Sequence, residues 1–192
     1  YSEPWDMLER QGWAFRRPEA MSLVDKLDSL VDAQSQAVTE HLAELSQAAD
    51  ADTVAVQAAF RAGKGFDKLM RLLEPLDQQE YVSEDSLTNS IAVLLNHVCK
   101  GCEDNCKLLR TSGLLEWLVE RLRSKSIAVV VQNHLVVALS RSVEACKSNC
   151  ELVGSLGAIP VVVDLLTSKS ETIQDYGTYF LQLCCTDTAS NC

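Results

Sequence analysis

A repeat of 44 residues constrains this chain more than any other feature of its sequence. The stretch that begins at Asn105-Cys106 and ends at Leu122 is written again from Asn149-Cys150 to Leu166, 44 residues later. The turn after it, Ser124-Lys125-Ser126, returns at the same offset as Ser168-Lys169-Ser170. A period of roughly 40 to 47 residues is typical of helical solenoids, in which successive units stack and share one core. The sequence therefore predicts an all-α repeat protein.

Apolar residues within the repeats follow the spacing of one helix face, i, i+3, i+4 and i+7. A glycine precedes each set, at Gly63 or Gly65, at Gly113 and at Gly157, which predicts a left-handed residue where a short first helix turns into a second. A third helix follows in each unit. The second-helix sets are Phe66/Leu69/Met70/Leu73, Leu115/Leu118/Val119/Leu122 and Ile159/Val162/Val163/Leu166, and the third-helix sets are Leu87/Ile91/Leu94/Leu95/Val98, Val131/Leu135/Ala138/Leu139 and Ile173/Gly177/Phe180/Leu181/Cys184.

The first part of the chain departs from this pattern. Residues 1–20 carry Trp5, Trp13 and Phe15 and read as an extended arm, which either covers the apolar end of the solenoid or docks on another subunit. One amphipathic helix is predicted from Glu19 to about residue 31, a second over residues 35–49, and a short third over residues 53–62. The acidic cluster at residues 50–53 is predicted to end one helix and cap the next.

The repeated stretch 156–166, followed by Ile173-Gln174-Asp175, resembles the armadillo repeat, and residues 131–140 are similar to the third helix of that repeat. This resemblance implies a right-handed α-solenoid of three-helix units. Ser190-Asn191-Cys192 matches the start of the preceding unit. The expected division is an arm at 1–20 and a repeat domain at 21–192, with a degenerate unit at about 21–52, repeats at 53–100, 101–145 and 146–189, and the start of a further unit at 190–192.

In armadillo proteins the third helices line a concave groove that binds extended segments of partners, and the resemblance implies the same here. Importin-type members place a tryptophan and, four residues later, an asparagine on this helix. The aligned pairs in this chain are Val93/His97, Val137/Arg141 and Tyr179/Leu183, which argues against a nuclear-import receptor. The predicted groove residues are Asn89, Asn96, His97, Asn133, Val137, Arg141, Asp175, Tyr179 and Gln182, with Trp5, Trp13 and Phe15 as the predicted docking residues of the arm.

The net charge of −10 and the pI near 4.7 disfavour nucleic acid and anionic membrane surfaces as partners. Extended or basic protein segments, or neighbouring subunits, fit better. No stretch reaches the ~18 apolar residues of a membrane-spanning helix, and no secretory signal is present. We therefore expect a soluble intracellular protein without membrane insertion, cytoplasmic or, after removal of a transit peptide, in an organelle lumen.

The cysteines are interpreted as reduced, small apolar core residues, because several recur at matching repeat positions. His97, Cys99, Cys102 and Cys106 form the one group with a spacing that approaches a zinc site, but a second paired cluster is missing. No metal or other cofactor is therefore expected.

Catalytic motifs are also missing from the sequence. Gly63-Lys64-Gly65 lacks the remaining residues of a phosphate-binding loop, and the acidic pair Glu103/Asp104 falls at a predicted helix start, where carboxylates favour the dipole. We predict a non-catalytic scaffold or adaptor without a small-molecule substrate, either free or as a structural subunit of a larger assembly. The alternative is an armadillo-type regulatory factor that exchanges nucleotide on a chaperone or small GTPase.

Overall fold

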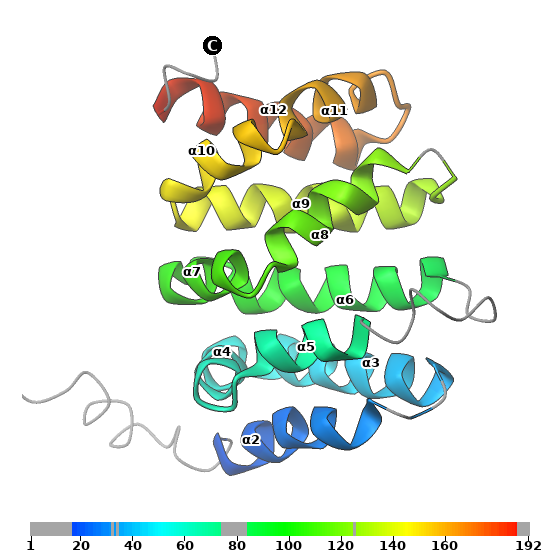
Figure 1. Ribbon diagram of the computed structural model, residues 1–192, viewed down its shortest axis with the longest axis vertical. Coiled ribbons are helices and arrows are strands. Elements are labelled where there is room, and N and C mark those ends of the chain that lie inside the picture. The colour runs from blue at the N-terminus through cyan, green and yellow to red at the C-terminus, as the bar shows by residue number, and fades with distance from the viewer. Residues whose placement is uncertain (1–16, 32, 34, 74–83, 125, 188–192) are drawn as a thin grey trace, which may run out of the picture.

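The computed structural model describes residues 17–31, 33, 35–73, 84–124 and 126–187. These ranges contain helices and turns and no β-strand. Figure 1 shows the helices stacked along one long axis, with α2 at one end and α11 and α12 at the other. The predicted all-α solenoid is confirmed. The helices are α2 (Arg17–Lys26), the 3-10 helix η2 (Leu27–Leu30), α3 (Ser35–Ala51), α4 (Thr53–Ala62), α5 (Gly65–Leu73), α6 (Glu84–Cys99), α7 (Glu103–Thr111), α8 (Leu114–Arg123), α9 (Val129–Ala145), α10 (Ser148–Ser155), α11 (Ala158–Leu165) and α12 (Glu171–Asp187).

Three successive triplets repeat one arrangement of a short helix, a second short helix and a long third helix. They are α4–α6, α7–α9 and α10–α12. The long helices pack in order, α3 on α6, α6 on α9 and α9 on α12, so they form one layer of the stack. The predicted short helix at residues 53–62 coincides with α4, and the three second-helix apolar sets lie in α5, α8 and α11, except Leu166, which caps the end of α11.

One apolar core runs through the whole stack. The i+3 member of each second-helix set, Leu69, Leu118 and Val162, is 0% exposed. Phe60 of α4 packs edge to face on Phe66 of α5, with ring centroids 5.5 Å apart. One residue of each second-helix set is therefore fully buried in the shared core, as the repeat pattern predicts.

The turns into α8 and α11 carry the predicted left-handed glycines. Gly113 has φ 87° and Gly157 has φ 71°, both in the region that a side chain disfavours. Pro160 lies in the first turn of α11, where its missing N–H has no helical partner to lose. The predictions for Gly113 and Gly157 are confirmed.

The turn into α5 differs, and the prediction that Gly63 or Gly65 is left-handed is wrong. Lys64 holds the positive φ, at 53°, and Gly63 has φ −88°. The two glycines serve close packing instead. A Cβ on Gly63 would lie 2.7 Å from Val24 Cγ1, and one on Gly65 would lie 2.4 Å from Phe60 Cδ1.

The first predicted helix is also broken into two parts. The chain forms α2 and then the 3-10 turn η2, instead of one continuous helix over residues 19–31. Leu27 and Leu30 are both buried, since residues three apart share one face of a 3-10 helix. The tighter turn thus keeps both leucines in the core.

A buried lysine joins this turn to α5. Lys68 Nζ donates to the Val24 carbonyl at 3.3 Å and pairs with Asp25 and Asp28 at 3.0 Å each. Burial lowers the pKa of Lys68, but the hydrogen bonds and charges of the two carboxylates outweigh that effect and raise it above its ordinary value. The first junction of the stack is therefore partly ionic.

Buried asparagines tie successive units together at equivalent positions of α7 and α10. Asn105 Nδ2 donates to the carbonyls of Val98 at 2.6 Å and Gln57 at 3.3 Å. Asn149 Nδ2 donates to the carbonyls of Ser142 and Cys106, both at 3.1 Å. Each amide thus bonds the third helix and the first helix of the preceding triplet. The Val98 and Ser142 carbonyls lie in the last turns of α6 and α9, where the helix itself supplies no N–H partner.

Side-chain caps define other helix ends. Asp52 Oδ1 accepts from the Ala55 N–H at 3.0 Å at the start of α4, which confirms the predicted cap. Glu103 and Asp104 lie in the first turn of α7, as predicted.

In the described residues no single helix is both long and apolar enough to cross a bilayer. Helices α10 and α11 reach that length and composition only together, and they are bent by 82° at their junction.

Candidate functional site

The long helices α6, α9 and α12 carry all nine of the predicted groove residues, three on each helix. The Asn89, Asn133 and Asp175 positions are equivalent in the repeat, and so are the Val93, Val137 and Tyr179 positions. Because α6 packs on α9 and α9 on α12, these residues form rows that cross from helix to helix. A row of this kind offers contacts at regular intervals to an extended segment.

The first row is partly used within the protein. Asn89 Oδ1 accepts from His134 Nδ1 at 2.7 Å, and Asn133 Oδ1 accepts from Ser170 Oγ at 2.7 Å. These bonds join α6 to α9 and α9 to the start of α12. Asp175 is exposed. The row therefore stabilises the stack through two of its members and presents a carboxylate on the third.

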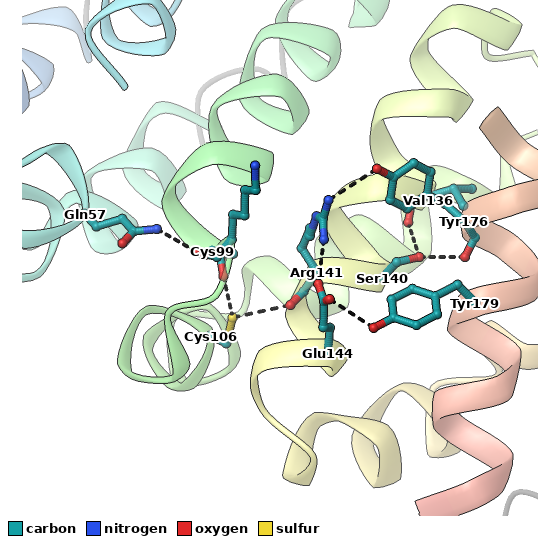
Figure 2. A network of polar contacts seen from close by, with 10 residues as sticks. Gln57, Cys99, Cys106, Val136, Ser140, Arg141, Glu144, Tyr176 and Tyr179 are labelled. Carbon is teal, nitrogen blue, oxygen red and sulfur yellow. Dashed lines mark hydrogen bonds and ion pairs between the residues drawn. The ribbon is translucent and has the colours of Figure 1, made fainter. Parts of the chain in front are cut away.

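Arg141 and Glu144 form the centre of a polar network at the end of α9 (Figure 2). Arg141 Nη1 donates to Glu144 Oε2 at 2.7 Å, and Tyr179 OH donates to Glu144 Oε1 at 2.9 Å. Arg141 Nη2 donates to Tyr176 OH at 3.2 Å, and the guanidinium lies 5.4 Å from the centroid of the Tyr176 ring. Four side chains from α9 and α12 are thereby held in one geometry.

Electrostatics keeps this network ionised. Burial raises the pKa of Glu144, but hydrogen bonds from Arg141 and Tyr179 and the charges of Arg141 and Lys100 outweigh it and lower the pKa below its ordinary value. The hydrogen bond to Glu144 raises the pKa of Tyr179. Near neutral pH the carboxylate is charged and the phenol keeps its proton, so the bond between them is charge-assisted.

The structure thus brings the predicted residues Arg141 and Tyr179 together, through two residues that the sequence analysis missed. Glu144 lies one turn after Arg141 on α9 and pairs with it at the i+3 spacing, which is a signal available in the sequence. Tyr176 lies one turn before Tyr179. Ser140, also missed, is buried, and the Val136 and Tyr176 carbonyls both lie 2.8 Å from its hydroxyl as acceptors for its one O–H.

The remaining predicted groove residues stand apart from this network. His97 Nδ1 lies 3.4 Å from Asp50 Oδ1 of α3, with a quarter of the histidine side chain exposed. Asn96 Oδ1 is buried and has no hydrogen-bond partner in the described part of the chain. Val137 is half-buried and Gln182 is exposed. These four residues are not linked to each other by any hydrogen bond or ion pair among the described contacts.

An open recess of about 500 Å³ lies beside the network. The turn between α6 and α7 forms one wall and the end of α9 forms the other. Four of its lining residues are charged, two of each sign. The lining consists of Lys100, Gly101, Glu103, Arg141, Glu144 and Ala145.

The cysteines near the recess are packed rather than converging. The single S–H of Cys106 has two carbonyls within reach, that of Cys99 at 3.4 Å and that of Arg141 at 3.7 Å. Arg61 Nη1 donates to Cys102 Sγ at 3.0 Å. The hydrogen bond with Cys106, together with burial, raises the pKa of the Cys99 thiol well above its ordinary value. Within the described ranges no group of three or more His, Cys, Asp or Glu side chains is arranged to hold a metal.

Some predictions lie outside the described residues. They concern Trp5, Trp13 and Phe15 of the arm, and the start of a further unit at residues 190–192.

Comparison with known proteins identifies the fold and not a family. No protein-family model and no curated protein matches the chain. Two engineered proteins of known crystal structure match 86% and 88% of this chain with 23% identity and TM-scores of 0.71 and 0.72. The chain spans 37% and 63% of their lengths. A designed armadillo repeat protein matches 93% of this chain and 85% of its own, with 17% identity and a TM-score of 0.50. The fold is an armadillo-like helical repeat.

Proposed function

We propose that this chain is a non-catalytic protein-interaction scaffold or adaptor that binds an extended segment of a partner across α6, α9 and α12. The Arg141–Glu144–Tyr176–Tyr179 network carries this proposal. It fixes charged and aromatic groups from two helices in one geometry, so a partner loses little entropy in ordering them. The net charge of −10 favours a segment that is basic or neutral overall.

Affinity purification with the full chain as bait tests this function. Wild-type chain should retain a defined set of companions, identified by mass spectrometry, and Arg141→Glu should lose them. Lys169→Glu, the same change of charge in the exposed turn before α12, is the control and should retain them. Arg141→Gln should give the same loss as Arg141→Glu, without adding repulsion against Glu144. Equal companions for all four baits would refute binding at this surface.

The same purification separates two forms of the proposal. Companions recovered in a fixed ratio, in a complex that resists salt, indicate a structural subunit of a larger assembly. Companions that dissociate as salt is raised indicate an adaptor, because exposed charge pairs are screened at high ionic strength.

A further inference from the structure

Each of the two carboxylates that line the recess already has a partner within the protein. Both carboxylate oxygens of Glu144 accept hydrogen bonds, from Arg141 and Tyr179. Glu103 Oε1 pairs with Lys107 Nζ at 2.9 Å on the outer side of α7. The two negative charges of the recess are therefore each matched by a cation already.

Lys100 is the unmatched cation. Its side chain is exposed and lines the recess, and in the described part of the chain its ammonium has no hydrogen-bond or ion-pair partner. Its positive charge contributes to lowering the pKa of Glu144. The four charged lining residues balance to zero, so the recess is less negative than the chain as a whole, whose net charge is −10.

Arg141 has spare donors as well. A guanidinium carries five N–H groups, and two nitrogens of Arg141 make one side-chain bond each, to Glu144 and to Tyr176. Stacking on the Tyr176 ring prevents the group from turning away. An incoming oxyanion would meet a fixed guanidinium on one wall and a flexible ammonium on the other.

We propose that this recess binds the side-chain carboxylate of an aspartate or glutamate in the partner segment, with Lys100 and Arg141 as its donors. The inference rests on the proposed function and specifies one position of the segment, which elsewhere is neutral or basic. A lysine or arginine side chain would find Glu103 and Glu144 occupied and Lys100 repelling it.

NMR titration of the full chain tests the recess without a partner protein. The probes are N-acetyl-glutamate α-amide and its uncharged counterpart, N-acetyl-glutamine α-amide, and the observed signals are the Gly101 amide and the Arg141 Nε–H. The glutamate probe should shift both signals in a saturable way, and the glutamine probe should not. Lys100→Gln should weaken the apparent binding about two- to fivefold, as expected for one partly exposed ion pair, while Lys169→Gln should leave it unchanged.

Three results would overturn the assignment. One is a response of Lys100→Gln to the glutamate probe equal to that of wild type. A second is a larger response of wild type to N-acetyl-lysine α-amide than to the glutamate probe. A third is tighter binding of inorganic phosphate than of the glutamate probe, which would make the recess a phosphate site. None of them would affect the companions lost by Arg141→Glu in the purification. The failure of this inference and the failure of the proposed function are therefore distinguishable.

Discussion

Helices α8 and α11 carry the same apolar spacing 44 residues apart, yet equivalent side chains on the two helices differ in burial. Val119 of α8 is 1% exposed, whereas its equivalent in α11, Val163, is 49% exposed. Leu115 is fully buried and its equivalent Ile159 is half-buried. In the stack α8 is followed by α10 and α11, which pack against it, and α11 and α12 come last among the described helices. The repeat sets which face is apolar, but the neighbouring unit sets whether that face is buried.

The largest test of this comparison places the same charge at both equivalent positions. Val119→Asp should cost about 3–5 kcal/mol of unfolding free energy, because it buries a carboxylate without a partner. Val163→Asp should cost no more than about 0.5 kcal/mol, since water still reaches the side chain. Urea unfolding followed by circular dichroism measures both values. Equal losses would mean that the outer face of α11 is covered in solution.

The buried asparagines give a smaller contrast between the same two units. Asn105 Oδ1 accepts from Arg61 Nη1 at 3.1 Å, whereas Asn149 Oδ1 is buried and unpaired in the described contacts. Each change to alanine removes the side-chain donor of a carbonyl in the last turn of a third helix, Val98 or Ser142, and should cost about 1–3 kcal/mol. Asn105→Ala should be the more costly, since it also removes the acceptor of a charged donor. A larger effect of Asn149→Ala on the urea midpoint, at unchanged m-value, would contradict this order.

The smallest effect concerns the contact between α9 and α12. The pKa of Glu144 is lower in the folded chain than the ordinary 4.5, so its stabilisation is present above that value and is lost as the pH falls through the folded pKa. Glu144→Gln should therefore flatten the decline of the melting temperature below pH 4.5 by about 1–2 °C, a small effect because the side chain is a third exposed. Parallel curves for variant and wild type would show that the pair contributes nothing to stability.

Much of the fold could be predicted from the sequence because the same pattern of apolar residues and glycines occurs in several successive units. The spacing of residues alone predicted the helix at 53–62, the helices that carry the apolar sets, and the glycine turns before α8 and α11. The turn at Lys64 did not, because a glycine can mark either a positive φ or a close approach, and only the neighbours Val24 and Phe60 decide between them.

The candidate site was less predictable, for a reason of geometry. Arg141 and Tyr179 were found as groove positions, but the carboxylate that joins them was not, because the Tyr179–Glu144 bond links side chains 35 residues apart on different helices. Asn89 was predicted as a groove position, and the alignment gave no sign that its amide oxygen accepts a hydrogen bond from His134. Aligning repeats identifies which positions are equivalent, and does not reveal how far each side chain reaches.

Chemical labelling of Lys68 can report on the contact of α2 and η2 with α5. An amine must be deprotonated and accessible to react with an acylating reagent, and Lys68 is 7% exposed with a pKa raised by Asp25 and Asp28. Its acylation should therefore wait until α2 and η2 separate from α5, while exposed lysines such as Lys169 react at once. The rate at which Lys68 is labelled would report local opening at this end of the solenoid, separately from unfolding of the whole chain.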